Sequence, residues 1–465
     1  MRPAQQTVYL PTPRLAALTY KANLPSSLLR PSLASTGSLT FARTRVGSMP
    51  QVPTVSQLAD LDYSPKPGKD QTDILLQRGR EALDKYRRDK YGDQSKTQSG
   101  PMTSAVAVER FKAQLSHYEK MEILEFRHVY CLGLGTKKLN TDLNLPNCGF
   151  DDDQGDYRAL VGDHISYRFE IMAILGKGSF GIVLRCFDHK QRETVALKIL
   201  RNIKRFVQQG TVETRVLELL RDRDPQGAMH IVQLKESFRF RKHLCLSFEL
   251  LGNDLLEVLR SNNYRGLTVA FAKGAAYQLL TTLKYIKELK IIHCDIKPEN
   301  ILIETTNRSS VKLIDFGSAC YETSRLYAYI QSRFYRAPEV ILGAGYSYPI
   351  DIWSLACVLA EICTGRPLFH GEDEKDQLQA IMEVLGPPPG KFLSACSRKS
   401  FFFEEDGEPK LSADSQGWVR HRSRRSLEEV VVDVGMVAFL RECLHWDPRL
   451  RLTPEEGLAH PWVRG

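Results

Sequence analysis

Long hydrophobic runs are missing from this 465-residue sequence, and none approaches the roughly 20 apolar residues that a membrane-spanning helix requires. Its ten cysteines do not stand in the paired spacing of a zinc or redox motif. Unpatterned cysteines are typical of a reducing compartment, where free thiols pack as small apolar groups. The composition therefore favours a soluble intracellular protein without a disulfide framework, and it gives a membrane-spanning protein no support.

Acidic residues are absent from residues 1–59, which are rich in Ser, Thr and Pro and lack sustained periodicity. Residues 1–100 contain 15 lysines and arginines and only 8 acidic residues, so this segment carries most of the net charge of +9. We predict that residues 1–100 form a basic, largely disordered tail. Residues 85–90 fit a nuclear localisation signal or an exposed basic helical turn. A transit peptide shares this composition, but five prolines interrupt the amphipathic helix that import requires: Pro3, Pro11, Pro13, Pro25 and Pro31.

The most informative segment reads His-Cys-Asp-Ile-Lys-Pro-Glu-Asn over residues 293–300, and Asp-Phe-Gly follows at 315–317. Phosphoryl transfer requires a group that orients a hydroxyl, a cation that faces phosphate, and oxygen ligands for metal ions. The two motifs supply these parts in one order: Asp295 as the catalytic base, Lys297 as the phosphate-facing cation, and Asn300 and Asp315 as Mg²⁺ ligands. They predict an enzyme that transfers a phosphoryl group.

A glycine-rich segment lies upstream between two runs typical of strands. Because strand-forming residues such as Val183 continue after it, we expect a hairpin tip and not the helix that follows the glycines of a dinucleotide-binding fold. Glycines allow backbone amides to approach phosphate oxygens closely. We therefore predict that this segment binds ATP through Gly176, Lys177, Gly178, Ser179, Phe180, Gly181 and Val183.

The short apolar run that ends at Lys198 matches a strand lysine that binds the α- and β-phosphates. A buried lysine of this kind requires an acidic partner. Residues 209–220 have the periodicity of an amphipathic helix and offer Glu213 and Glu218, and helical spacing favours Glu213. Further on, residues 243–251 predict a strand that enters a hinge, with Phe248 limiting the back of the pocket. The backbone of Glu249 and Leu251 would bind the adenine edge, beside walls formed by Val183 and Ala196.

With these motifs in this order, residues 168–463 resemble a eukaryotic protein kinase. The resemblance implies an α+β, bilobal fold with a small β-rich N-lobe at about 168–248 and a large helical C-lobe at about 252–463. It implies a group-specific insert at about 371–425. In this family Ala337-Pro338-Glu339 closes the activation segment, Arg451 pairs with that glutamate and Asp351 braces the catalytic loop.

Two other classes of protein are less consistent with these residues. A pseudokinase scaffold is disfavoured because the residues that such proteins tend to lose are all present: Lys198, Glu213, Asp295, Asn300 and Asp315. A small-molecule phosphotransferase would not need Ala337-Pro338-Glu339 or the tyrosine-containing loop at residues 327–336, because both serve to receive a polypeptide.

The departures from the general kinase pattern narrow the family. Cys294 replaces the arginine that captures an activation-loop phosphate in many kinases. The loop carries Tyr327 and Tyr329, followed by Ser-Arg-Phe-Tyr-Arg at 332–336. Together these features closely resemble the dual-specificity tyrosine-phosphorylation-regulated kinases of the CMGC group, and residues 163–169 resemble their class II branch.

That resemblance implies autophosphorylation of Tyr329, with Tyr327 as a spectator and with Arg333 and Arg336 binding the new phosphate. The alternative is that Tyr329 is a buried packing residue. The enzyme would then transfer the γ-phosphate of MgATP, with Mn²⁺ as an alternative metal, to Ser or Thr of protein substrates. A disulfide between Cys294 and Cys320 is a further hypothesis.

Residues 101–167 resemble the class II accessory region, partly ordered against the N-lobe, with an acidic box at Asp151–Asp153. The alternatives are an acidic patch that is only solvated and a region that merely packs on the small lobe. Six apolar residues would form that packing: Leu115, Tyr118, Ile123, Val129, Leu132 and Leu134.

Substrate preference follows from the same resemblance. Arg336 would shape a pocket for proline, while Glu257, Glu299 and Glu361 would bind a substrate arginine through bidentate contacts. Solvated surface carboxylates are the alternative for each acid. We do not expect nucleic-acid binding, because stacking aromatics are not interleaved with the basic residues of the insert. We expect a monomer in the cytoplasm, the nucleus or both.

Overall fold

The computed structural model describes residues 101–465 except 326–328, 411–416, 418–419 and 421–424. The predicted tail, residues 1–100, and Tyr327 lie outside the described residues. All described residues belong to one compact unit of the chain, Lys69–Gly465. Within them, no helix is both long enough and apolar enough to cross a membrane.

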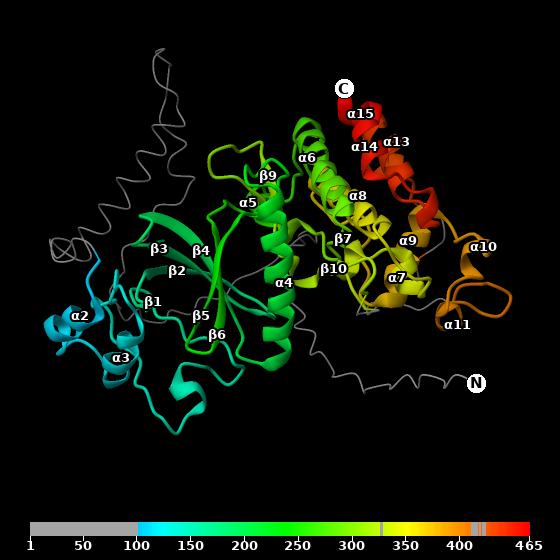
Figure 1. Cartoon of the computed structure of the whole chain (residues 1–465). Coiled ribbons are helices and arrows are strands. Elements are labelled where there is room, and N and C mark those ends of the chain that lie inside the picture. Colours follow the sequence, from blue (N-terminus) through cyan, green and yellow to red (C-terminus); the bar gives the residue numbers. More distant parts are fainter. Residues whose placement is uncertain (1–100, 326–328, 411–416, 418–419, 421–424) are drawn as a thin grey trace, which may run out of the picture. The chain divides into compact units, whose positions relative to one another are not determined.

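A six-stranded antiparallel sheet forms the first half of the described chain, in the order β1-β2-β3-β4-β6-β5 (Figure 1). In β3, buried and less buried side chains alternate, and Ile182, Leu184 and Cys186 face the core. The predicted hairpin is confirmed, because β2 and β3 are paired and the glycine-rich segment connects them. The strand bounds are β1 His164–Ile165, β2 Phe169–Lys177, β3 Gly181–Asp188, β4 Glu193–Leu200, β5 Leu234–Phe240 and β6 His243–Glu249.

Helix α4, Lys204–Arg223, runs along this sheet (Figure 1). Its apolar face buries Val216, Leu217 and Leu220, which share a core with β5 and β6. The helix approaches β4 closely at Gly210, where an added Cβ would lie 2.1 Å from Leu200 Cδ1. This close packing places one face of α4 beside the end of β4, where the predicted active-site lysine lies.

The second half of the described chain is helical and is built around α8, Pro349–Thr364, in which every residue from Ile350 to Ile362 is buried. A helix that is apolar on all sides must be enclosed by other elements. Helices α6, Val269–Glu288, and α13, Val434–Cys443, pack against it, as does the short turn Arg333–Tyr335. The other helices of this half are α5 Leu255–Ser261, α7 Pro338–Leu342, α9 Glu374–Leu385, α10 Gly390–Leu393, α11 Lys399–Phe402, α12 Leu427–Val430, α14 Pro454–Ala459 and α15 Pro461–Arg464.

Four short strands lie between α6 and α7 and carry the catalytic segments: β7 Ile291–Ile292, β8 Ile301–Ile303, β9 Val311–Leu313 and β10 Cys320–Tyr321. They form two small antiparallel pairs, β8 with β9 and β7 with β10. The predicted His-Cys-Asp motif therefore follows β7, and the Asp-Phe-Gly motif follows β9. The two pairs hold these motifs side by side.

The accessory region, residues 101–167, packs on the sheet through α2, Ser104–Phe111, and α3, His117–Glu122 (Figure 1). Leu115, Ile123, Val129 and Leu132 are buried in one cluster with strand residues, and Tyr118 packs against it. The prediction is wrong for Leu134, whose side chain is 38% exposed. Polar contacts add to the packing, since the buried Arg241 guanidinium lies 2.9 Å from Glu122 and 3.0 Å from the Tyr157 hydroxyl.

One fully buried ion pair joins the two ends of the helical part. Arg451 donates to both carboxylate oxygens of Glu339 at 2.6 Å, and both side chains are inaccessible to solvent. The guanidinium also donates to the carbonyls of His445, Pro349 and Trp446. Because every donor direction is used, the charge is fully compensated inside the protein.

We expect Arg451→Met to lower the free energy of unfolding by about 3–5 kcal/mol, because it leaves the Glu339 carboxylate buried and unpaired. The matched control is Arg449→Met, which removes an exposed pair with Asp447 and should cost at most about 1 kcal/mol. Urea denaturation of the purified variants measures both values. Equal losses for the two variants would contradict the assignment, and Arg451→Met with Glu339→Met should recover much of the stability.

Candidate active site

A network of three charged side chains lies where the sheet meets the catalytic segments. Lys198 Nζ, on β4, contacts Glu213 Oε1 of α4 at 2.7 Å and Asp315 Oδ1 at 2.9 Å. The lysine is thus paired with Glu213, whereas the Glu218 carboxylate accepts from the Ser237 hydroxyl on β5. The network joins three segments that are far apart in the sequence.

Burial and charge act in opposite directions on these groups. Burial disfavours the ammonium form of Lys198, but the charges of Asp315 and Glu213 outweigh it and raise the pKa of Lys198. Burial would raise the pKa of Asp315, but the charge and hydrogen bond of Lys198 lower it to about 2. Burial raises the pKa of Glu213 despite the opposing charge of Lys198. Lys198 and Asp315 are therefore charged at neutral pH.

Asp295 lies in the catalytic loop, and its carboxylate accepts hydrogen bonds from the side chains of Lys297, Ser332 and Asn300. Its Oδ2 accepts from Lys297 Nζ at 2.6 Å, and its Oδ1 accepts from the Ser332 hydroxyl at 2.7 Å. Lys297 Nζ also reaches the Ser332 oxygen at 3.2 Å. A hydroxyl between this carboxylate and this ammonium has the surroundings that a phosphate-accepting hydroxyl requires.

Helix α8 holds the backbone of the catalytic loop through hydrogen bonds to Asp351. The Asp351 carboxylate accepts from the amide N–H of His293 at 2.8 Å and from that of Cys294 at 3.0 Å. This fixes Cys294 in the left-handed region, at φ 66°. Burial raises the pKa of Asp351, whereas the charge of the His293 side chain and the two amide hydrogen bonds act in the opposite direction. These two hydrogen bonds thus position Asp295, which is the next residue after Cys294.

Asn300 and Asp315 offer oxygen atoms suited to a divalent cation. Asn300 Nδ2 donates to the Asp295 carbonyl at 2.8 Å, which leaves the amide oxygen as a ligand. Lys198 contacts Asp315 through Oδ1, so Oδ2 is left for a cation. An ionised carboxylate and an amide oxygen are hard ligands, which fit Mg²⁺.

A cavity of about 760 Å³ lies between the sheet and the catalytic segments. Its apolar walls include Val183, Ala196 and Phe248, and charged groups at one end include Lys198 and Asp315. A flat apolar slot with a charged end fits a nucleotide. Of the predicted ATP-binding residues, the cavity is lined by Gly176, Val183, Ala196, Lys198, Phe248, Glu249 and Leu251.

The tip of the glycine-rich segment, Lys177 to Gly181, does not line this cavity. Gly178 in the tip, and Gly176 just before it, have no atom within 4 Å of an added Cβ, so they leave room for an approaching ligand. Gly181 is required by the fold itself, because it has φ 147° and an added Cβ would lie 2.1 Å from the Ile199 carbonyl oxygen.

The acidic segment at residues 151–156 binds this tip through ion pairs with Lys177. Lys177 Nζ contacts Asp152 at 2.8 Å and Asp156 at 3.0 Å. Asp156 also accepts from Arg201 Nε at 2.7 Å, and Arg201 in turn donates to the Gly178 carbonyl at 3.2 Å. Within the acidic box, Asp151 accepts from Asn147 and lies 2.8 Å from His243, whereas Asp153 is exposed. The box is therefore structural and is not only a solvated patch.

Tyr329 is 62% exposed, so it is not a buried packing residue. The Arg336 guanidinium lies over its ring, 4.0 Å from the centroid, and donates to the Ile330 and Gln331 carbonyls. Arg333 contacts the backbone carbonyls of Gly371 and Glu372. The arrangement brings Arg336 directly to Tyr329, while Arg333 is bound to the segment before α9.

The three acids predicted to bind a substrate arginine lie in different surroundings. Glu257 and Glu299 line the cavity and are accessible, and Glu257 also contacts Arg260 at 2.6 Å. Glu361 is only 3% exposed, and its carboxylate accepts from the Tyr335 hydroxyl at 2.7 Å. Burial raises the pKa of Glu361 to about 7, with a smaller rise from the charge of Glu299 and against the hydrogen bond of Tyr335.

The thiols of Cys294 and Cys320 lie 3.7 Å apart, between the catalytic loop and β10. The hydrogen bond between the thiols raises the pKa of Cys294, to which burial also contributes, and it lowers the pKa of Cys320. The disulfide hypothesis stays a prediction.

Two residues with clear structural roles were not singled out from the sequence. Ser332 contacts both Asp295 and Lys297, as described above. Gln331 has φ 65°, donates to the Ile350 carbonyl and the Ser354 hydroxyl, and accepts from the Ala337 amide. In the sequence, only their position just ahead of Ala337-Pro338-Glu339 could have indicated a role for them. Their partners are evident only in the folded chain.

This fold, with its lysine–glutamate pair and its catalytic Asp-x-Lys segment beside a nucleotide-sized cavity, defines a protein kinase. The family model "Protein kinase domain" matches residues 169–463. The described residues and this match agree with the predicted α+β kinase fold.

Comparison with curated proteins identifies the family within the kinases. The chain is 47% identical to dual specificity tyrosine-phosphorylation-regulated kinase 4 of Homo sapiens over 371 residues, 79% of this chain and 71% of that protein. It is 46% identical to dual specificity tyrosine-phosphorylation-regulated kinase 3 of Macaca fascicularis over 383 residues, 78% and 67% of the two chains. It is 47% identical to the DYRK-family kinase pom1 of Schizosaccharomyces pombe over 358 residues, 76% of this chain and 33% of that protein.

The chain therefore belongs to the dual-specificity tyrosine-phosphorylation-regulated kinase family of the CMGC group. It is an ATP-dependent protein kinase that uses a divalent metal and acts on protein substrates, as the sequence predicted.

We expect Asp156→Asn to raise KM for ATP about three- to tenfold. The substitution weakens the charge-assisted contacts of Asp156 with Lys177 and Arg201, worth ~1 kcal/mol, and so frees the tip of the glycine-rich segment. Steady-state kinetics at fixed peptide concentration measure the change. Asp153→Asn, three residues before Asp156 and exposed, is the matched control and should leave KM for ATP unchanged. An unchanged KM in Asp156→Asn, or an equal rise in Asp153→Asn, would contradict the role of these contacts.

Proposed function

We propose that this chain is a class II member of its family that phosphorylates its own Tyr329 and then transfers the γ-phosphate of MgATP to Ser or Thr of protein substrates. The observation that carries this proposal is the hydroxyl site between Asp295 and Lys297. The Ser332 hydroxyl holds that position, 2.7 Å from the carboxylate and 3.2 Å from the ammonium. A substrate hydroxyl in the same surroundings would be oriented by Asp295.

Each predicted residue then has one task. ATP and Mg²⁺, when bound, supply the phosphoryl group and neutralise its charge. Asn300 and Asp315 would hold the metal, Lys198 would bind the α- and β-phosphates, and Glu213 keeps the lysine in place. Lys297 would stabilise the γ-phosphate while Asp295 accepts the hydroxyl proton.

Phosphorylation of Tyr329 would add a dianionic group beside Arg336, which already lies over the ring at 4.0 Å. Charge-assisted hydrogen bonds would then form between the phosphate and Arg336. Arg333 could join them by leaving the backbone carbonyls that it contacts. These bonds would order the activation segment near Gln331, which contacts α8, and Ser332, which contacts the catalytic loop.

We also propose that the substrates carry arginine and proline near the phosphorylated residue. Glu257 and Glu299 are accessible to an arginine, and Glu361 lies close enough to Glu299 for their charges to interact. A guanidinium between two carboxylates would relieve that repulsion. We further propose that the chain acts as a monomer, without nucleic acid, in the cytoplasm, the nucleus or both.

The proposed activity is tested with wild type, Asp295→Asn, Tyr329→Phe and Tyr327→Phe, each expressed in bacteria. We expect phosphate on Tyr329 of the wild type and MgATP-dependent labelling of an Arg-x-x-Ser-Pro peptide. Asp295→Asn should lower kcat at least about 100-fold and lose the phosphotyrosine. Tyr329→Phe should lower kcat/KM about tenfold because the phosphate no longer orders the segment, and Tyr327→Phe should be unaffected. Active wild type without phosphate on Tyr329, shown by mass spectrometry, would refute autophosphorylation there.

Arginine recognition should depend on pH because the pKa of Glu361 is about 7. As the pH rises from 6 to 8 the carboxyl loses its proton, so its attraction for a guanidinium increases. KM for an arginine-containing peptide should therefore fall, by up to about tenfold, relative to KM for a proline peptide without arginine. In Glu361→Gln the arginine peptide should have a high KM at every pH. Parallel pH profiles for the two peptides would contradict the role of Glu361.

A further inference from the structure

Among the described residues outside the active site, two clusters of potential metal ligands lie where the accessory region meets the sheet. One contains Glu119, Asp163 and His164, and the other contains Cys131, Glu170 and His189. The first already holds a cation, because Lys138 Nζ lies 2.9 Å from Glu119 and 2.5 Å from Asp163. In the second cluster the carboxylate of Glu170 is paired with His189 and not with a lysine or arginine, so this cluster is the candidate for an external cation.

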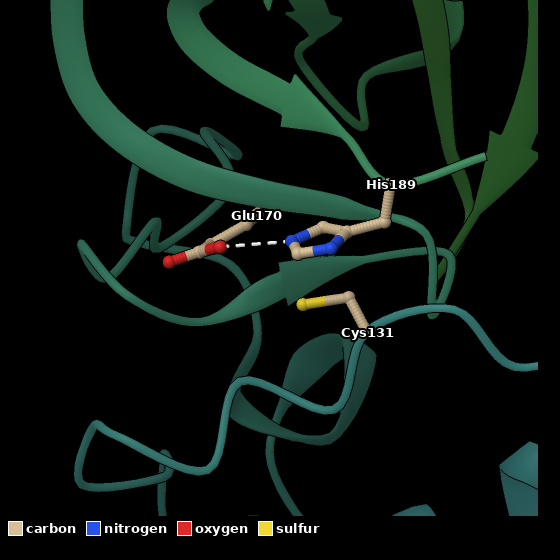
Figure 2. Close-up of side chains that lie close together, drawn as sticks. All are labelled: Cys131, Glu170 and His189. Carbon is tan, nitrogen blue, oxygen red and sulfur yellow. Dashed lines mark hydrogen bonds and ion pairs between the residues drawn. The ribbon is translucent and has the colours of Figure 1, made fainter. Parts of the chain in front are cut away.

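Figure 2 shows that the three side chains of the second cluster point toward one another from different segments. Cys131 comes from the accessory region, Glu170 from β2 and His189 from the turn after β3. Their ligand atoms all lie within 4.8 Å of one another, and His189 Nε2 is 2.8 Å from Glu170 Oε2. A tetrahedral Zn²⁺ site places such atoms about 3.3–3.6 Å apart, so small side-chain rotations complete the geometry.

We propose that Cys131, Glu170 and His189 bind a Zn²⁺ ion that fastens the accessory region to the first hairpin of the sheet. Thiolate, imidazole and carboxylate are the ligand types that zinc takes in proteins, whereas Mg²⁺ and Ca²⁺ prefer oxygen alone. One thiolate and one carboxylate balance the two charges of the ion. When the metal binds, the Cys131 thiol releases its proton to solvent, and the proton in the hydrogen bond between His189 and Glu170 leaves that bond, so that both groups can bind the ion.

The backbone around the three ligands is held by hydrogen bonds, which favours a preformed site. The Cys131 amide donates to the Tyr167 carbonyl at 3.0 Å, and the His189 amide donates to the neighbouring Arg168 carbonyl at 3.2 Å. Glu170 follows two residues later, within β2, and is paired in register with Phe187. The Phe187 ring also packs edge-on against the His189 imidazole at 5.0 Å and orients it.

Burial gives the site one closed side and one open side. Cys131 is 4% exposed, whereas the Glu170 and His189 side chains are 24% and 27% exposed. A metal can enter past the exposed pair and reach the buried sulfur. The fourth position of the tetrahedron faces solvent and would be taken by water.

The site is tested on the full chain, freed of metal by a chelator and kept in excess Mg²⁺ so that the active-site ligands are occupied. Titration with Co²⁺, which replaces Zn²⁺, should produce a sulfur-to-cobalt charge-transfer absorption at a stoichiometry of one. Cys131→Ser should abolish that absorption. Cys148→Ser, which removes another cysteine of the accessory region, is the matched control and should retain it.

Zinc affinity is measured by competition with a chromophoric chelator in wild type, Glu170→Gln and His189→Gln. Both variants replace partly exposed side chains, so their folding is not at risk as that of Cys131→Ser is. Each should weaken Zn²⁺ binding more than about 100-fold, since even outer-shell partners of a metal site are worth about 10–100-fold. Zn²⁺ should also raise the Tm of the wild type and not that of Glu170→Gln.

The proposal is overturned if Co²⁺ binds without the sulfur absorption, or if the absorption survives in Cys131→Ser. It is likewise overturned if the two glutamine variants bind Zn²⁺ as tightly as the wild type. Far-UV circular dichroism measured in parallel shows whether each variant is folded.

Discussion

The ammonium group of Lys198 is the point on which the catalytic arrangement depends. It contacts a carboxylate from α4 and another from the Asp-Phe-Gly motif, so one charge fixes the relative positions of the sheet, the helix and the metal-binding segment. The interaction is strong because all three groups are largely removed from solvent, where charges interact more strongly than in water. Gln209 of α4 reinforces it by donating to the Gly317 carbonyl at 2.5 Å.

A second set of polar contacts determines how the rest of the small lobe is organised. The accessory region does more than cover apolar surface, because its acids reach the glycine-rich segment through Lys177 and Arg201. It also supports Arg241, whose buried guanidinium lies 3.9 Å from the Phe150 ring centroid. Changes in the accessory region can therefore alter ATP binding without touching the cavity.

Prediction from the sequence succeeded where the chemistry lies within a short segment. The hairpin at the glycine-rich segment and the choice of Glu213 over Glu218 followed from local periodicity, and the structure has both. Prediction was weaker for burial. Leu134 was expected to pack but is exposed, and the surroundings of Glu361, with a Tyr335 hydroxyl beside it, could not be inferred because α8 packs against distant segments on every side.

The sequence by itself determined the class of enzyme, because Asp295, Lys297 and Asn300 stand within six residues and their spacing specifies their chemistry. Only the tertiary structure decided which distant groups meet. Lys198 and Asp315 are 117 residues apart, and Cys131 lies far from Glu170 and His189 in a sequence without metal-binding spacing. Such contacts depend on strand register and on packing between segments, which arise from the whole chain and leave no local pattern.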